Sequence, residues 1–179
     1  MSRRLLIAWA CLIATVVSVG AARPATAADV AAQTCASFSP AAAVRSESLA
    51  SFEAVTPRRL VDTRDGTGGV AQPVGAGCTL RIDVDVAAVP ADAGAVALSV
   101  TALGSQPGFL TVFPCASGLP DTSNINTRAG GFPTPNLVVA IPDANRRVCI
   151  YSLFEADVIV DLTGWWTEDG EHHLTTVAP

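Results

Sequence analysis

Strict alternation of apolar and polar residues is the feature that most constrains the fold of this chain. The segment 81–86 reads Arg-Ile-Asp-Val-Asp-Val, so its apolar side chains would point to one face of a strand and its charged side chains to the other. Alternating patterns or short apolar runs recur along the chain, at 96–101, 109–113, 136–141, 148–153 and 157–163. Glycine and proline separate these segments, and none after residue 50 has the periodicity of a three-turn helix.

Short strands at such regular spacing are typical of β-sandwiches and β-barrels. We therefore predict an all-β fold, an antiparallel β-sandwich of jelly-roll or Ig-like type with about nine or ten short strands. Turn-forming residues lie between 96–101 and 109–113 and between 136–141 and 148–153. These two connections predict two β-hairpins.

The N-terminal segment has the three parts of a secretory signal peptide. Two arginines precede an uncharged run over 5–22, and small residues surround Ala27. We predict a signal peptide over 1–27, followed by an Ala/Ser-rich arm or linker over 28–50 and the β-sandwich domain over 51–179. An uncleaved membrane anchor is the alternative, because the apolar run is close to the shortest length that spans a bilayer.

Composition excludes several classes of protein. Half of the 179 residues are hydrophobic and 15% are charged, which is unlike a disordered chain. The net charge is −5, and removal of 1–27 would take away three of the 11 basic residues and none of the 16 acidic ones, leaving −8. An acidic chain does not fit a nucleic-acid binder that contacts phosphates. We expect no nucleic-acid partner, no cofactor and no membrane attachment after signal cleavage.

Four cysteines remain once the predicted signal peptide, which contains Cys11, is removed. An even number of cysteines in an exported protein predicts disulfides. Their spacing is too wide for the close ligand pairs of a structural zinc site, so we predict no metal. We predict Cys115–Cys149, which would tie two strand ends together, and Cys35–Cys78, which would staple the arm onto the domain.

The most distinctive polar stretch places Asp62, Arg64 and Asp65 beside a glycine-rich turn over 66–69. One interpretation is a ligand or calcium site in which Asp62 and Asp65 supply oxygen atoms. The other is architectural: Arg64 pairs with one acid, and the glycines adopt positive φ at a turn. We favour the architectural interpretation, while keeping all three residues as candidates for ligand binding.

Aromatic and amide side chains provide the remaining candidates for ligand binding. Trp165 and Trp166 are adjacent, so a strand would direct them to opposite faces, one into the core and one outward. An exposed tryptophan together with Tyr151 could stack on a sugar ring; alternatively both tryptophans pack against the arm or a neighbouring module. Asn124 and Asn126 lie in a polar loop, where they could bind ligand hydroxyls, although we expect them to cap turns.

No set of residues predicts catalysis. Asp83 and Asp85 would share the outer face of one strand, as would Asp157 and Asp161, and such acids are usually solvated. The chain has no Gly-x-Ser-x-Gly motif, and its two histidines are adjacent and close to the C-terminus. We therefore predict no catalytic residue and no enzymatic activity.

Several motifs resemble a recurrent β-rich module of secreted actinobacterial proteins. The segment 55–68 reads VTPRRLVDTRDGTG, 108–115 reads GFLTVFPC, 148–152 reads VCIYS and 161–165 reads DLTGW. The resemblance covers about residues 52–166. It implies an extracellular, β-rich unit that occurs in tandem or appended to other domains, and it implies no activity and no catalytic residues.

These observations together lead to a functional expectation. We expect a secreted, non-catalytic binding or structural module at the cell surface, with cell-wall polysaccharide or a neighbouring extracellular protein as its partner. A small extracellular hydrolase that uses carboxylates or a metal is one alternative. An adhesion or spacer module without a small ligand is the other, and burial of the aromatic side chains would favour it.

Overall fold

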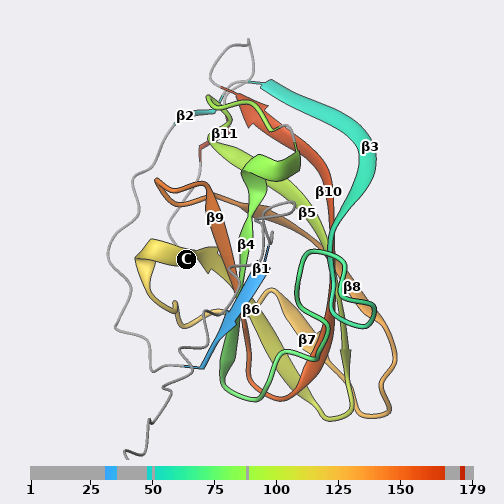
Figure 1. Ribbon diagram of the computed structural model, residues 1–179. Coiled ribbons are helices and arrows are strands. Elements are labelled where there is room, and N and C mark those ends of the chain that lie inside the picture. The colour runs from blue at the N-terminus through green and yellow to red at the C-terminus, as the bar shows by residue number, and fades with distance from the viewer. Residues whose placement is uncertain (1–30, 36–47, 50, 88, 168–173, 176–179) are drawn as a thin grey trace, which may run out of the picture.

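The computed structural model of the chain is shown in Figure 1, and the structure describes residues 31–35, 48–49, 51–87, 89–167 and 174–175. The predicted signal peptide and both histidines lie outside these residues. In the described ranges no helix has the length and apolar character that crossing a membrane requires.

Nine strands form two antiparallel sheets in the described part of the chain. The five-stranded sheet has the order β1 (Ala31–Thr34), β4 (Cys78–Asp83), β9 (Arg147–Ser152), β6 (Gly108–Pro114) and β7 (Ile125–Thr127). The four-stranded sheet has the order β3 (Ser51–Asp62), β10 (Ala156–Thr167), β5 (Ala95–Gly104) and β8 (Thr134–Ala140). Shorter elements complete the list: the ribbon of β2 (Ser48–Leu49) with β11 (Leu174–Thr175), and the 3₁₀ turns η1 (Val84–Ala87) and η2 (Cys115–Ser117).

The two sheets enclose one hydrophobic core, which confirms the predicted all-β sandwich. Alternate residues of each strand point inward, so that Ile82 and Ile150 of one sheet face the same core as Leu98 and Val160 of the other, all fully buried. Branched aliphatic residues fill most of this space because the chain has few aromatic residues.

The two predicted hairpins are wrong. Strand β5 pairs with β10 and β8, whereas β6 pairs with β9 and β7 in the other sheet. Strand β8 likewise pairs with β5, and β9 pairs with β4 and β6. The turn residues that suggested hairpins are instead connections between the two sheets, since the chain changes sheet at almost every step from β3 to β10.

The predicted strand over 81–86 is also shorter than the alternation implied. Strand β4 ends at Asp83, and the chain turns into η1. Arg146 explains the turn: its Nε donates to Asp85 at 2.8 Å, and its two terminal nitrogens donate to the carbonyls of Pro90 and Ala93 at 2.7 and 2.6 Å. Asp83 and Asp85 therefore do not share the outer face of one strand.

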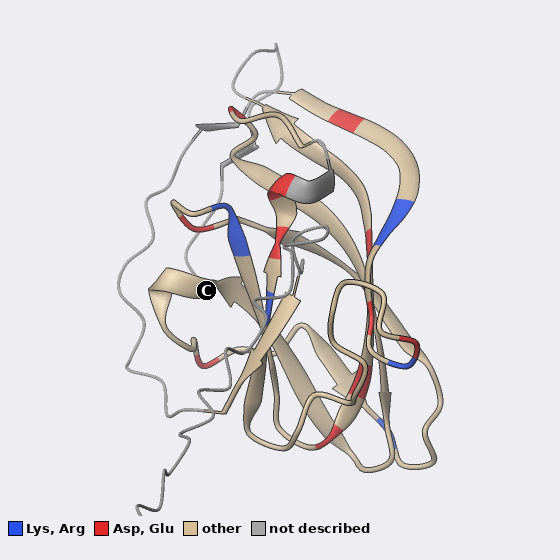
Figure 2. Ribbon diagram, in the orientation of Figure 1, with Lys and Arg blue, Asp and Glu red and all other residues tan. Residues whose placement is uncertain are grey.

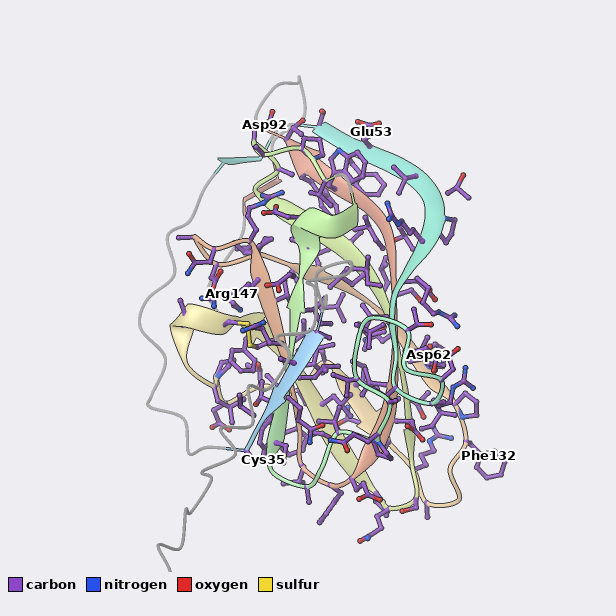
Figure 3. All side chains as sticks on the ribbon, viewed as in Figure 1. Cys35, Glu53, Asp62, Asp92, Phe132 and Arg147 are labelled. Atoms are coloured by element: carbon purple, nitrogen blue, oxygen red, sulfur yellow. A yellow bond between two sulfur atoms is a disulfide. The ribbon has the colours of Figure 1, made fainter. Side chains whose placement is uncertain are left out.

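Both predicted disulfides are confirmed, since the structure joins Cys35 to Cys78 and Cys115 to Cys149. The first bridge follows β1, which pairs with β4 at the edge of the five-stranded sheet. Residues 31–34 of the predicted arm thus contribute a strand to the sandwich, which their composition did not indicate. Figure 3 labels Cys35 at the end of this strand.

Candidate functional site

Asp62 is the centre of a charged cluster at the end of β3 (Figure 3). Its side chain is 1% exposed and accepts hydrogen bonds from Arg64 Nε at 2.8 Å, Arg64 Nη2 at 2.7 Å and Arg59 Nη1 at 3.0 Å. Arg59 also donates to Asp161 of β10, with its Nε at 2.9 Å from the carboxylate. The cluster therefore ties β3, β10 and the following loop together.

The hydrogen bonds from Arg64 lower the pKa of Asp62, and the burial of this carboxylate opposes them. The same contact raises the pKa of Arg64. Asp65 is exposed and accepts a hydrogen bond from the backbone N–H of Thr67 at 2.9 Å, as in a turn. Among the described residues, no group of three or more His, Cys, Asp or Glu side chains is placed to hold a metal ion. The contacts of Asp62 and Asp65 are those that the architectural interpretation describes.

Trp165 and Trp166 point to opposite faces of β10, as their adjacency predicts. Trp165 is 8% exposed and belongs to the core, whereas Trp166 is half-buried and lies against Phe52, with ring centroids 4.5 Å apart. Gly164 makes room for this pair, because a Cβ there would lie 2.5 Å from the Phe52 ring. Only Trp166 of the two could offer any surface to a ligand.

Tyr151 lies in the other sheet, on β9, so it does not form one aromatic row with the tryptophans. Its neighbour across the β6–β9 ladder is Thr111, and its ring lies near that of Phe109, with centroids 6.1 Å apart. Both rings are partly exposed on the outer face of the five-stranded sheet. This pair is the second partly exposed aromatic pair, beside Phe52–Trp166, in which Phe52 is 49% exposed. Of the Phe109–Tyr151 pair, sequence reasoning identified only Tyr151.

A hollow of about 330 Å³ opens beside this ring pair. We call it the Tyr151 hollow, and its lining consists of Phe109, Leu119, Pro120, Asp121, Thr122, Ser123 and Tyr151. The rings form one wall, and the loop between η2 and β7 forms the other. Volumes of this size lie at the lower end of the range for sites that hold small ligands.

The loop wall of the hollow is held to the sheet along its length. Its start is fixed by the Cys115–Cys149 disulfide, and the Thr111 hydroxyl donates to the carbonyl of Thr122. Its end is fixed by Asn124, whose Oδ1 accepts from the backbone N–H of Val112 at 2.7 Å. The loop therefore presents a wall that is largely organised before any ligand binds.

The contacts separate the two candidate asparagines. The Asn124 side chain accepts from the backbone N–H of Val112 within β6, so it extends the hydrogen bonding of that strand, and its carbonyl accepts from the Asn136 side chain at 2.7 Å. Asn126 is exposed on β7, opposite Phe109 in the ladder, and does not line the hollow. Neither side chain is among the residues that line the hollow.

Polar groups at the rim of the Tyr151 hollow can form hydrogen bonds. Asp121, Thr122 and Ser123 are exposed, and Asp121 has no ion pair within the part of the chain that the structure describes. A free carboxylate accepts hydrogen bonds, and hydroxyls both donate and accept. None of the described residues that line the hollow is an arginine, so its chemistry suits a neutral ligand with many hydroxyl groups rather than an anion.

Sequence reasoning missed Phe109, Asp121 and Ser123 as members of one site. Phe109 alternates with the inward-facing Leu110, which would have indicated an outward side chain. Its proximity to Tyr151 depends on the pairing of β6 with β9, which was not among the predicted strand pairs. Comparisons with protein-family models, curated proteins and solved structures found no match to this chain.

Proposed function

We propose that this chain is a secreted, non-catalytic module that binds a neutral glycan of the cell wall at the Tyr151 hollow. The observation that carries the proposal is the pairing of two partly exposed rings with a fixed polar loop across an open hollow. The two disulfides are typical of an oxidising, extracytoplasmic environment, where such a glycan is found.

Sugar rings match this surface in two ways. A pyranose has an apolar face of C–H groups, which can pack on the exposed sides of Phe109 and Tyr151 and remove their apolar area from water. Its hydroxyls lie around the edge, where Asp121 and Ser123 can form hydrogen bonds with them. Because the hollow is small, we expect it to hold one or two sugar units and, as a single site, to bind them weakly.

Binding to purified cell-wall polysaccharide, measured by retention and by calorimetry with soluble fragments, tests the proposal. Tyr151→Thr and Phe109→Thr each keep a residue suited to a strand but remove a ring, so we expect each to weaken binding by about tenfold or more. Phe132→Ser is the matched control, because Phe132 is 69% exposed and lies outside the hollow. Failure of the unchanged protein to bind, or binding by both ring variants as tight as that of the unchanged protein, would overturn the proposal.

Trp166→Thr reports on the Phe52–Trp166 pair, and loss of binding in that variant alone would place the glycan site on the other sheet.

Two other functions remain to be separated from glycan binding. The hydrolase alternative has less support, because the Asp62 carboxylate is fully engaged by arginines. Turnover of ester, peptide or glycoside substrates that disappears in Asp62→Asn would favour it. A spacer module would bind no glycan in any of these assays.

A further inference from the structure

Strand β8 lies at an edge of the four-stranded sheet, and among the strands that the structure describes it pairs only with β5. Its side chains alternate in exposure. Val138 and Ala140 are buried in the core, whereas Leu137 is 62% exposed and Val139 is 46% exposed on the outer face. The strand thus combines a one-sided backbone ladder with exposed apolar side chains, and we call this surface the β8 edge.

The hydrogen bonds of β5 determine which backbone groups of β8 remain available. Successive residues of a strand direct their backbone groups to opposite sides. The carbonyl of Gly104 accepts from Gly131 at 3.1 Å, on the side where β8 lies, so the even-numbered residues of β5 face β8. Leu98 is one of them, and its partner in the register is Val138. Val138 therefore directs its backbone groups toward β5.

Leu137 and Val139 must then direct their backbone N–H and C=O groups away from the sheet. Pro135 belongs to the same outward set, which agrees with its lack of an N–H, because a proline at this place removes no bond to β5. Among the described residues, the hydrogen bonds outside the strand ladders do not involve these backbone groups. The β8 edge can therefore accept another strand.

The β8 edge differs in charge from the opposite edge of the same sheet. Exposed edge strands are usually protected by charged residues, prolines or bulges. The opposite edge of the same sheet, β3, has Glu53, Pro57, Arg58 and Arg59, and a bulged ladder with β10. Strand β8 has no charged residue (Figure 2), and its one proline, Pro135, lies near its start.

We propose that β8 of one molecule pairs with β8 of a second copy, antiparallel and around a two-fold axis close to Val138. In this register Leu137 lies opposite Val139 of the second copy, and Val139 opposite its Leu137. Each outward pair exchanges two N–H···O bonds, and each exposed apolar side chain meets another apolar side chain. The edge is thus complementary to itself, as a two-fold interface requires.

Electrostatics also favour this part of the surface for contact between copies. The chain has a net charge of −5, so two copies repel each other over most orientations. Contact through an uncharged strand keeps this repulsion small, and salt should weaken it further. The interface would bury less than the roughly 800 Å² per partner of standard complexes, so the association should be weak and dependent on concentration.

Sedimentation of the full chain tests the proposal from about 10 μM to about 1 mM, the range in which a small interface changes its occupancy. We expect the average mass to rise toward that of a dimer with concentration, and to rise further at high salt. Leu137→Pro removes only an outward N–H, and Val139→Lys places a charge on the edge. Each should reduce the association constant by about tenfold or more.

Ala116→Lys is the matched control, because it adds the same positive charge at an exposed position of η2, on the other sheet. It should associate as the unchanged protein does. Thermal unfolding of each variant checks that the sandwich is intact. A protein that stays monomeric at all concentrations and at high salt would overturn the proposal. Association that neither edge variant weakens would also overturn it, because another surface would then be responsible.

Discussion

Replacement of Asp62 by asparagine should be the most destabilising single substitution in the charged cluster at the end of β3. The carboxylate is 1% exposed and accepts from both Arg59 and Arg64. Asparagine keeps the size but has one acceptor oxygen, and its amide would face guanidinium donors. Breaking a buried ion pair costs about 3–5 kcal/mol. Both arginine side chains are more than 40% exposed and can regain water, so we expect about 2–3 kcal/mol.

Urea unfolding measures this loss directly. With a slope of about 1.5 kcal/mol per M, the midpoint should fall by roughly 1–2 M while the slope stays unchanged. Asp65→Asn is the control, because Asp65 is exposed and contacts only a backbone N–H through its side chain, so it should change stability by about 0.5 kcal/mol or less. If the two variants lose equal stability, the buried ion pairs of Asp62 do not stabilise the fold.

The dependence on pH follows from the same contacts. The pKa of Asp62 is lowered in the folded state, so its contribution to stability is present above the ordinary carboxyl pKa of about 3.9 and is lost as pH falls toward the folded value. The stability of the unchanged protein should therefore decline more steeply below about pH 4 than that of Asp62→Asn. Parallel declines in the two proteins would contradict this assignment.

Three further changes test other parts of the structure. Gly68→Ala should cost more than about 1 kcal/mol in urea unfolding, because Gly68 has a φ of 86° and a Cβ there would collide with the carbonyl of Leu60. Arg146→Ala should lower the free energy of unfolding by about 1–3 kcal/mol, since three hydrogen bonds are lost; an unchanged melting temperature would refute that role. Removal of Cys115–Cys149 as a pair of alanines should cost about 2–4 kcal/mol and also weaken glycan binding by freeing the loop wall.

Local sequence patterns were sufficient for the fold class but not for the pairing of strands. Alternation at 148–153 and 157–163 locates strands because the side-chain period is a property of each segment alone. Pairing depends on which segments meet in space, and turn residues look alike whether they join two paired strands or cross from one sheet to the other. Between β5 and β6, and between β8 and β9, the chain crosses from one sheet to the other.

The candidate site was predictable only in part for the same reason. The pairing of Arg64 with Asp62 is local, and the sequence indicated it. The second partner, Arg59, is also nearby in the chain, and its spacing of three residues along an extended strand gave no reason to expect the contact. The Phe109–Tyr151 pair joins strands that are far apart in the sequence, so only the sheet order reveals it.

The repeated change of sheet along the chain has a consequence for how the molecule folds. Apart from β6 with β7, strands that are consecutive from β3 to β10 do not pair, so almost no sheet contact can form between neighbours in the chain. Most tertiary contacts join residues that are distant in sequence. Chains of this kind must close long loops before they gain stabilising contacts, and they fold in milliseconds to seconds rather than microseconds. Strand β10 pairs with both β3 and β5, so the four-stranded sheet can be completed only after nearly the whole domain has been synthesised.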